Sequence, residues 1–193
     1  MTYKPKNYTH LIGTPGFSEK LLTNHFKLYE GYVTNVNKAI DILKTTEIGT
    51  PQHSEVRRRF GWEFNGMRLH EDYFGNMSKT PKRLDASSAL AKQIIQDFGS
   101  LDAWEKDFRA SCGMRGVGWA SLVYDPEGKR LFNIWINEHD VGHLAGSVSI
   151  LVGDVFEHAY MVDYGINRAD YIAAFMNVID WKEVSKRFDA VAD

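Results

Sequence analysis

Apolar residues recur at three- and four-residue steps along much of the chain, and this spacing gathers them on one face of a helix. Ser18 and Ser100 belong to the residue types that cap helix N-termini well, and each directly precedes such a stretch. Gly49 and Pro51 interrupt the pattern between the first stretch and the second. We therefore expect helices over residues 18–43, 53–73, 87–98, 101–112 and 168–188.

Strand patterns lie between the last two of these helices. Two strand-like runs, 118–124 and 129–136, are separated by residues 125–128, Asp-Pro-Glu-Gly, which have the chemistry of a tight turn. This arrangement predicts a β-hairpin. A third apolar run, 149–152, predicts a short buried strand that ends at Gly153.

The order of these elements predicts an α+β fold. We expect an N-terminal α-helical hairpin, followed by a C-terminal domain with a three-stranded antiparallel sheet and helices. Residues 76–81 contain several turn-forming residues, so we place the domain boundary there. This gives an N-terminal helical hairpin domain over 1–80 and a C-terminal α/β domain over 81–193.

Composition and charge narrow the function. The 193 residues are 44% hydrophobic and 25% charged, which is typical of a globular protein that buries a core of its own. The formal net charge of −2 gives no support to a nucleic-acid partner. No apolar run approaches the length needed to span a membrane, and the N-terminus lacks a continuous apolar signal segment. One cysteine, Cys112, excludes an internal disulfide and a cysteine metal cage, and we expect a cytoplasmic protein.

The third strand leads into the most distinctive chemistry of the chain. Asp154, Glu157 and His158 follow it within five residues and lie among apolar side chains. A buried ionised carboxylate is costly unless it is paired or bound to a metal. If this segment forms one helical turn, Asp154 and His158 share a face, and their ligand types suit iron, manganese or zinc. The alternative is that Asp154 caps a helix beginning at Val155 and that His158 is a core histidine.

A metal site needs further ligands, and the helical hairpin offers two histidines. His25 and His70 lie on helix faces that can turn inward, one on each arm of the hairpin. His10 and His53 lie among polar residues and are expected at the surface. Gly66 comes four residues before His70, so its missing side chain would leave space beside that imidazole.

Three motifs resemble those of the iron/manganese superoxide dismutases. Residues 153–160 resemble the family's DxWEHAY signature, and 65–73 resemble its NGxxLHxxYW element. Residues 25–33 resemble its first helix, and the resemblance extends through 116–119 to the terminal helix.

The motifs also depart from the family pattern. Phe156 and Phe74 stand where tryptophan is usual. His25 lies seven residues before Tyr32, whereas the family's usual ligand lies eight before that tyrosine. We infer that this chain lacks a residue which other members absorb as a π-bulge.

The resemblance implies that the protein converts superoxide to dioxygen and hydrogen peroxide at one iron or manganese ion per chain. The implied metal ligands are His25, His70, Asp154 and His158, together with a solvent molecule. Tyr32 would relay protons, and His139 would hydrogen-bond the metal-bound solvent, with Glu138 as the alternative. His143 is expected to be structural.

The resemblance also implies a homodimer or a dimer of dimers. Glu157 would reach across the dimer interface to His158 of the other subunit. Leu28 and Met161 replace a histidine and a tyrosine that are usual near the substrate entrance, which would change proton supply.

Two competing functions remain open from the sequence. One is a non-catalytic metal-binding homologue that kept the fold, and the other is a mononuclear iron oxygenase using two histidines and one carboxylate. The sequence does not choose between iron and manganese, or between dimer and tetramer.

Overall fold

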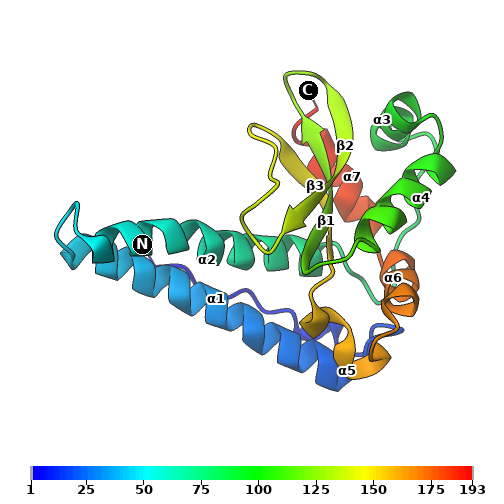
Figure 1. The fold of residues 1–193 in the computed structure, drawn as a ribbon. Coiled ribbons are helices and arrows are strands. Elements are labelled where there is room, and N and C mark those ends of the chain that lie inside the picture. Colours follow the sequence, from blue (N-terminus) through cyan, green and yellow to red (C-terminus); the bar gives the residue numbers. More distant parts are fainter. Residues whose placement is uncertain (1, 193) are drawn as a thin grey trace.

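The computed structural model describes residues 2–192, and they form the expected α+β fold (Figure 1). Helices α1 (Glu19–Thr45) and α2 (Pro51–Gly75) make the N-terminal hairpin. The Ser18 hydroxyl accepts a hydrogen bond from the Leu21 amide and caps α1 as expected. Helix α2 begins two residues before the predicted start, because Pro51 suits the first helical position.

The predicted sheet is confirmed. Strands β1 (Gly118–Asp125), β2 (Arg130–Asn137) and β3 (Val148–Asp154) pair antiparallel in the order β2-β1-β3. Helices α3 (Ala89–Phe98) and α4 (Leu101–Cys112) precede the sheet and match their predicted ranges closely. The central strand β1 places Trp119 opposite Ile136 on one side and opposite Asp154 on the other. The register therefore puts Asp154 at the same level as a fully buried tryptophan.

The last part of the chain differs from the prediction of one long helix over 168–188. Two helices, α6 (Arg168–Asn177) and α7 (Trp181–Asp189), occupy this range. They are preceded by two short elements, η2 (Glu157–Ala159) and α5 (Met161–Tyr164). The single helix was wrong because residues 178–180 leave the helical path. Val178 accepts a hydrogen bond from the Ser78 amide, Ile179 bridges Met77, and the Asp180 side chain caps α7. Apolar periodicity hides this break, since Val178 and Ile179 are buried in either arrangement.

The segment directly after α2 is hydrogen-bonded to the sheet. Asn76 is fully buried, and its side chain exchanges hydrogen bonds with the backbone N–H and C=O of Val152 in β3. This contact ties the end of the hairpin to the sheet. The division of the chain into domains at residue 80 stays a prediction, and its outer ends, residues 1 and 193, lie outside the described part of the chain.

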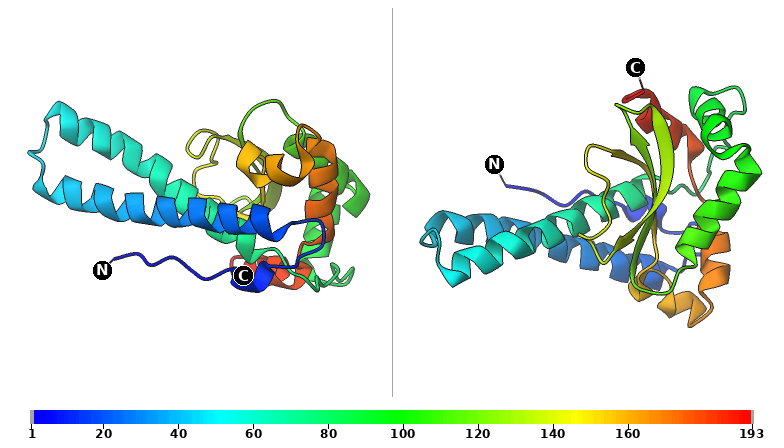
Figure 2. Two further views of the ribbon diagram at one scale, coloured as in Figure 1. Left: turned by 90° about the horizontal axis from the view of Figure 1, so that it is seen from below. Right: turned by 45° about the horizontal axis from the view of Figure 1, so that its top comes forward.

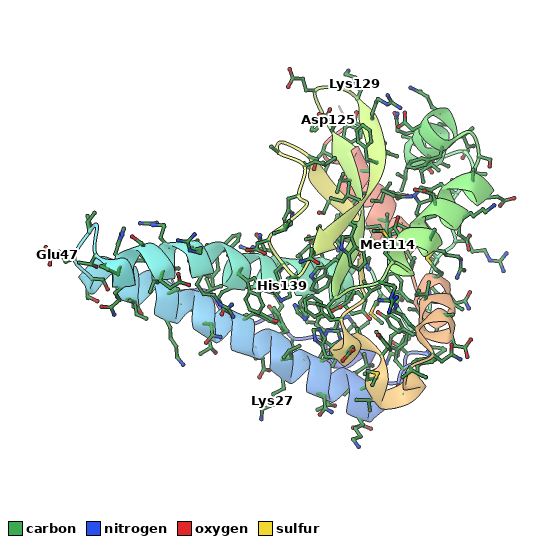
Figure 3. The ribbon with its side chains drawn as sticks, in the orientation of Figure 1. Lys27, Glu47, Met114, Asp125, Lys129 and His139 are labelled. Atoms are coloured by element: carbon green, nitrogen blue, oxygen red, sulfur yellow. The ribbon has the colours of Figure 1, made fainter. Side chains whose placement is uncertain are left out.

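The hairpin projects away from the sheet, as Figures 1 and 2 show, and the N-terminal segment runs alongside it. Figure 3 places Glu47 at the free tip of the hairpin and His139 where the loop after β2 meets the helices. At the other end of the hairpin, fully buried aromatic side chains from α2, β1 and α6 pack together: Tyr73, Phe74, Trp119, Tyr171 and Phe175. Within residues 2–192, no helix is both long and apolar enough to cross a bilayer.

Candidate metal centre

Four side chains converge from four separate elements at the base of the hairpin. They are His25 of α1, His70 of α2, Asp154 at the end of β3, and His158 of η2, and their ligand atoms all lie within 4.8 Å of one another. Asp154 Oδ2 lies 3.1 Å from His25 Nε2, 3.2 Å from His158 Nε2 and 3.8 Å from His70 Nε2. Three of the four side chains are almost fully buried, while that of His158 is 26% exposed. The cluster is therefore nearly closed, with its open side at His158.

The local structure that brings Asp154 and His158 together is not the helical turn that their spacing suggested. Asp154 is the last residue of β3, and Phe156 is extended. The short 3₁₀ turn at Glu157–Ala159 then brings the His158 ring back to the carboxylate. Asp154 caps no helix at Val155, although its Oδ1 accepts a hydrogen bond from the Phe156 amide at 2.9 Å.

The His70 imidazole fits a metal ligand. Its Nδ1 donates a hydrogen bond to the Gly66 carbonyl at 2.6 Å, so the lone pair of the neutral ring is on Nε2. That Nε2 is buried and has no hydrogen-bond partner among the described residues. A buried polar atom left in this state costs about 1–3 kcal/mol, and a cation at the centre of the four side chains would remove the cost.

The charges of the cluster also suit a cation. Burial opposes ionisation of Asp154, but the nearby His158 and the hydrogen bonds from His158 and His25 hold the pKa of the carboxyl well below its usual range. Burial lowers the pKa of both His25 and His70, so these rings stay neutral. One carboxylate and three imidazoles form a donor set that suits iron, manganese or zinc. This set is not the two-histidine, one-carboxylate arrangement of the competing oxygenase.

Stability of the metal-free protein should fall as the pH falls below about 6.5. Burial lowers the pKa of His139 from 6.5 to about 4, and it lowers those of His25 and His70 as well. Between pH 4 and pH 6.5 the unfolded chain therefore binds more protons than the folded one. The contribution of these histidines to the free energy of unfolding is complete above pH 6.5 and is lost as the pH falls towards 4. Urea unfolding of chelator-treated protein across this range measures the effect. The variant H139Q should reduce the slope of unfolding free energy against pH, and a flat profile for the parent protein would contradict the lowered histidine pKa values.

Tyr32 and His139 meet beside the cluster. Tyr32 Oη lies 2.8 Å from His139 Nε2, and Trp119 Nε1 donates to His139 Nδ1 at 3.0 Å. Because an indole N–H can only donate, Nδ1 must accept, and the neutral His139 ring carries its proton on Nε2. His139 therefore donates to Tyr32 Oη, which leaves the phenol hydrogen free to be donated elsewhere.

Glu138, the alternative to His139, points away from the cluster. Its Oε2 accepts a hydrogen bond from Trp62 Nε1 at 3.0 Å, and the side chain is exposed. His143 behaves as a structural residue, since its Nε2 donates to the His139 carbonyl at 2.9 Å. The loop thus directs His139 inward and Glu138 outward.

The space expected beside His70 at Gly66 is not empty. A Cβ added at Gly66 would lie 2.6 Å from Tyr32 Cδ1, so Tyr32 fills this space. The missing side chain therefore allows α1 and α2 to approach closely at the tyrosine.

Two aromatic residues complete the surroundings. Phe156 stacks on the His139 ring at a centroid distance of 4.7 Å and on the His158 ring at 5.0 Å. Trp62 packs against His139 with centroids 4.4 Å apart. Trp62 was not among the residues predicted for the site, although it lies eight residues before His70, about two helical turns, and so near the same face of α2.

Comparison with known proteins agrees with this geometry. Residues 86–187 match the family described as "Iron/manganese superoxide dismutases, C-terminal domain". A protein of Haloferax volcanii named as manganese superoxide dismutase 2 is 38% identical over 199 aligned positions, covering 100% of this chain and 98% of its own. The chain belongs to the iron/manganese superoxide dismutase family. An iron-named superoxide dismutase of Methanothermobacter thermautotrophicus is 33% identical, with 90% of this chain and 86% of the relative covered.

Membership confirms the resemblance seen in the sequence motifs. His25 stands seven rather than eight residues before Tyr32, yet it lies in the cluster. Helix α1 is regular throughout, so the shorter spacing is accommodated without a break. Leu28 and Met161, which depart from the usual superoxide dismutase pattern, are both partly exposed, at 37% and 41%. Both therefore leave apolar surface open to a partner or to water.

Proposed function

We propose that this chain is a superoxide dismutase that converts superoxide to dioxygen and hydrogen peroxide at one iron or manganese ion. His25, His70, Asp154 and His158 would hold the ion. The observation that carries the proposal is the convergence of these four ligand atoms within 4.8 Å of one another. One of them, His70 Nε2, has no hydrogen-bond partner in the part of the chain that the structure describes. Relatives of this chain are named as superoxide dismutases of both metals, which supports the reaction and leaves the metal open.

The bound metal supplies one-electron exchange between its 2+ and 3+ states. In total, two superoxide ions and two protons yield one dioxygen and one hydrogen peroxide. The single carboxylate, Asp154, contributes one negative charge, while His25 and His70 are kept neutral by burial. Burial of this donor set excludes bulk water, so the charge of Asp154 would interact strongly with a cation at the site.

Protons are delivered by the chain's own hydrogen-bonded side chains. Burial raises the pKa of Tyr32 above its ordinary value, so the phenol keeps its proton under physiological conditions. His139 is neutral, since burial lowers its pKa to about 4, and it donates to Tyr32 Oη. The Tyr32 hydroxyl is then the group with a hydrogen to give, and Trp119 fixes the orientation of His139.

We further propose that the protein works as a homodimer. Glu157 is exposed on the open side of the cluster, next to His158, and the segment that follows exposes Met161 and Val162. These residues would form the interface, with Glu157 approaching His158 of the other subunit. Light scattering should give twice the chain mass of 22.1 kDa or a higher multiple, and the chain mass alone would contradict the proposal. A cytoplasmic location stays a prediction.

The decisive experiment is purification without added metal, followed by elemental analysis and an assay of superoxide decay. We expect about one iron or manganese ion per chain and rapid decay of superoxide. Reconstitution of chelated protein with each metal separately shows which ion supports the reaction. Stoichiometric metal without activity would favour the non-catalytic homologue, and zinc alone would exclude the redox reaction.

A further inference from the structure

The loop after β2 is fastened to α2 through a tryptophan that the proposed mechanism does not use. Trp62 Nε1 donates to Glu138 Oε2 at 3.0 Å. The guanidinium of Arg59 lies 3.6 Å from the centroid of the indole ring, and Arg59 pairs with Glu63 at 3.0 Å. Trp62 is therefore held by a hydrogen bond and by a cation over its ring.

Trp62 packs directly against the two residues that carry protons. Its ring centroid lies 4.4 Å from that of His139 and 5.6 Å from that of Tyr32. It also lines a groove of about 250 Å³ that reaches Tyr32, together with Leu28, Gly31, Asn35, Arg59 and Glu63. Trp62 and Tyr32 thus lie side by side in the wall of this groove.

The backbone at Glu138 is strained in a way that serves this contact. Glu138 has a φ of 49°, in the left-handed region, and Lys129 in the β1–β2 turn is the only other non-glycine residue of the described range with a positive φ. Such a conformation is unfavourable for a non-glycine residue and is retained where the surroundings impose it. Here it turns Glu138 towards Trp62 while the next side chain, His139, faces Tyr32.

We propose that Glu138 and Trp62 form a positioning pair, in which their hydrogen bond anchors the loop on α2 and holds His139 against Tyr32. The role of the pair in catalysis rests on the proposed dismutase function. The anchor is needed because the loop residues around it, 137–146, are exposed except for His139 itself. Apart from the anchor, position 138 is held by the hydrogen bond from its own amide to the Val117 carbonyl at 3.0 Å, which fixes the backbone N–H but not the side chain. Loss of the anchor would therefore leave the loop free to shift about this point, and such a shift would turn His139 away from Tyr32.

The chain allows matched substitutions. E138N keeps a residue that tolerates the left-handed conformation but shortens the side chain by one methylene, and W62F keeps an aromatic ring but removes the N–H. E138Q keeps the length of the side chain and an oxygen that can accept the hydrogen bond from Trp62. K129N changes the other left-handed residue, which lies in the β1–β2 turn, and controls for relief of backbone strain alone.

Two measurements separate positioning from a general effect on structure. In metal-free protein, nitrogen-15 NMR of His139 should show one tautomer, protonated on Nε2, in the parent, E138Q and K129N. E138N and W62F should show averaged tautomers. In metal-loaded protein, these two variants should lower kcat about tenfold, which is part of the effect of a positioned proton donor, and should leave kcat/KM within about twofold.

The outcomes are distinct. If E138N and W62F leave both the His139 signals and kcat unchanged, or if E138Q is as impaired as E138N, the positioning pair is wrong. If the parent shows no dismutase activity but the NMR pattern is as expected, the pair stands as a structural device and the proposed function fails.

Discussion

Replacing Asp154 by asparagine is expected to abolish metal binding and activity while leaving the chain folded. The substitution removes the single carboxylate of the cluster, whose Oδ2 lies within 3.8 Å of the Nε2 atoms of all three histidines. Metal affinity should fall by more than the roughly 10–100-fold that is typical when a residue supporting a ligand is lost. The fold should persist, since the asparagine oxygen can still accept the hydrogen bond from the Phe156 amide.

Elemental analysis after dialysis against a chelator, together with the superoxide assay, measures this effect. D102N is the matched control, because Asp102 is an exposed carboxylate in the first turn of α4. It should keep full metal content and activity. A D154N protein with stoichiometric metal and parental activity would show that the ion is bound elsewhere.

Replacing Gly66 by alanine should lower activity strongly and stability modestly. The added methyl group would lie 2.6 Å and 2.7 Å from two carbons of the Tyr32 ring, and that ring is fixed by its bond to His139. Overpacking costs about 1–3 kcal/mol, of which the better helix propensity of alanine offsets about 1 kcal/mol. Displacement of Tyr32 should reduce kcat on the order of tenfold or more, because a proton donor out of place loses most of its effect.

Gly61 offers the comparison within the same helix. A Cβ at this position would meet nothing within 4 Å, so G61A should gain up to about 1 kcal/mol in unfolding free energy and keep the parental kcat. Urea unfolding measures the unfolding free energy of both variants, and steady-state kinetics measure their kcat. Equal behaviour of G66A and G61A would mean that Tyr32 does not depend on the close approach of the helices.

Much of the fold could be predicted because its elements are specified by neighbouring residues. Ser18 and Ser100 cap the helices that they precede, and the turn after Asp125 joins two strands as its residue types require. The prediction was wrong where a distant segment changed the local structure. Residues 178–180 leave the helix to pair with Met77 and Ser78, about a hundred positions earlier in the chain.

The candidate site could likewise be predicted in part. Ligand types and their motifs are visible in the sequence, so His25, His70, Asp154 and His158 could be selected. The helical turn considered for Asp154 and His158 does not form. A spacing of four residues is compatible with several backbone paths, and the strand register with Trp119 selects among them. The space at Gly66 was misjudged for a similar reason, since Tyr32 comes from the other helix.

The sequence by itself determined the strands, the helices before the sheet and the chemical types of the ligands, because capping, periodicity and turn chemistry act over a few residues. Only the tertiary structure decided that His25 meets Asp154, 129 positions away, and that His139 rather than Glu138 faces the site. It also decided the tautomer of His139, which Trp119 imposes from β1. These outcomes depend on packing between separate elements, and residue spacing carries no information about distance across such contacts.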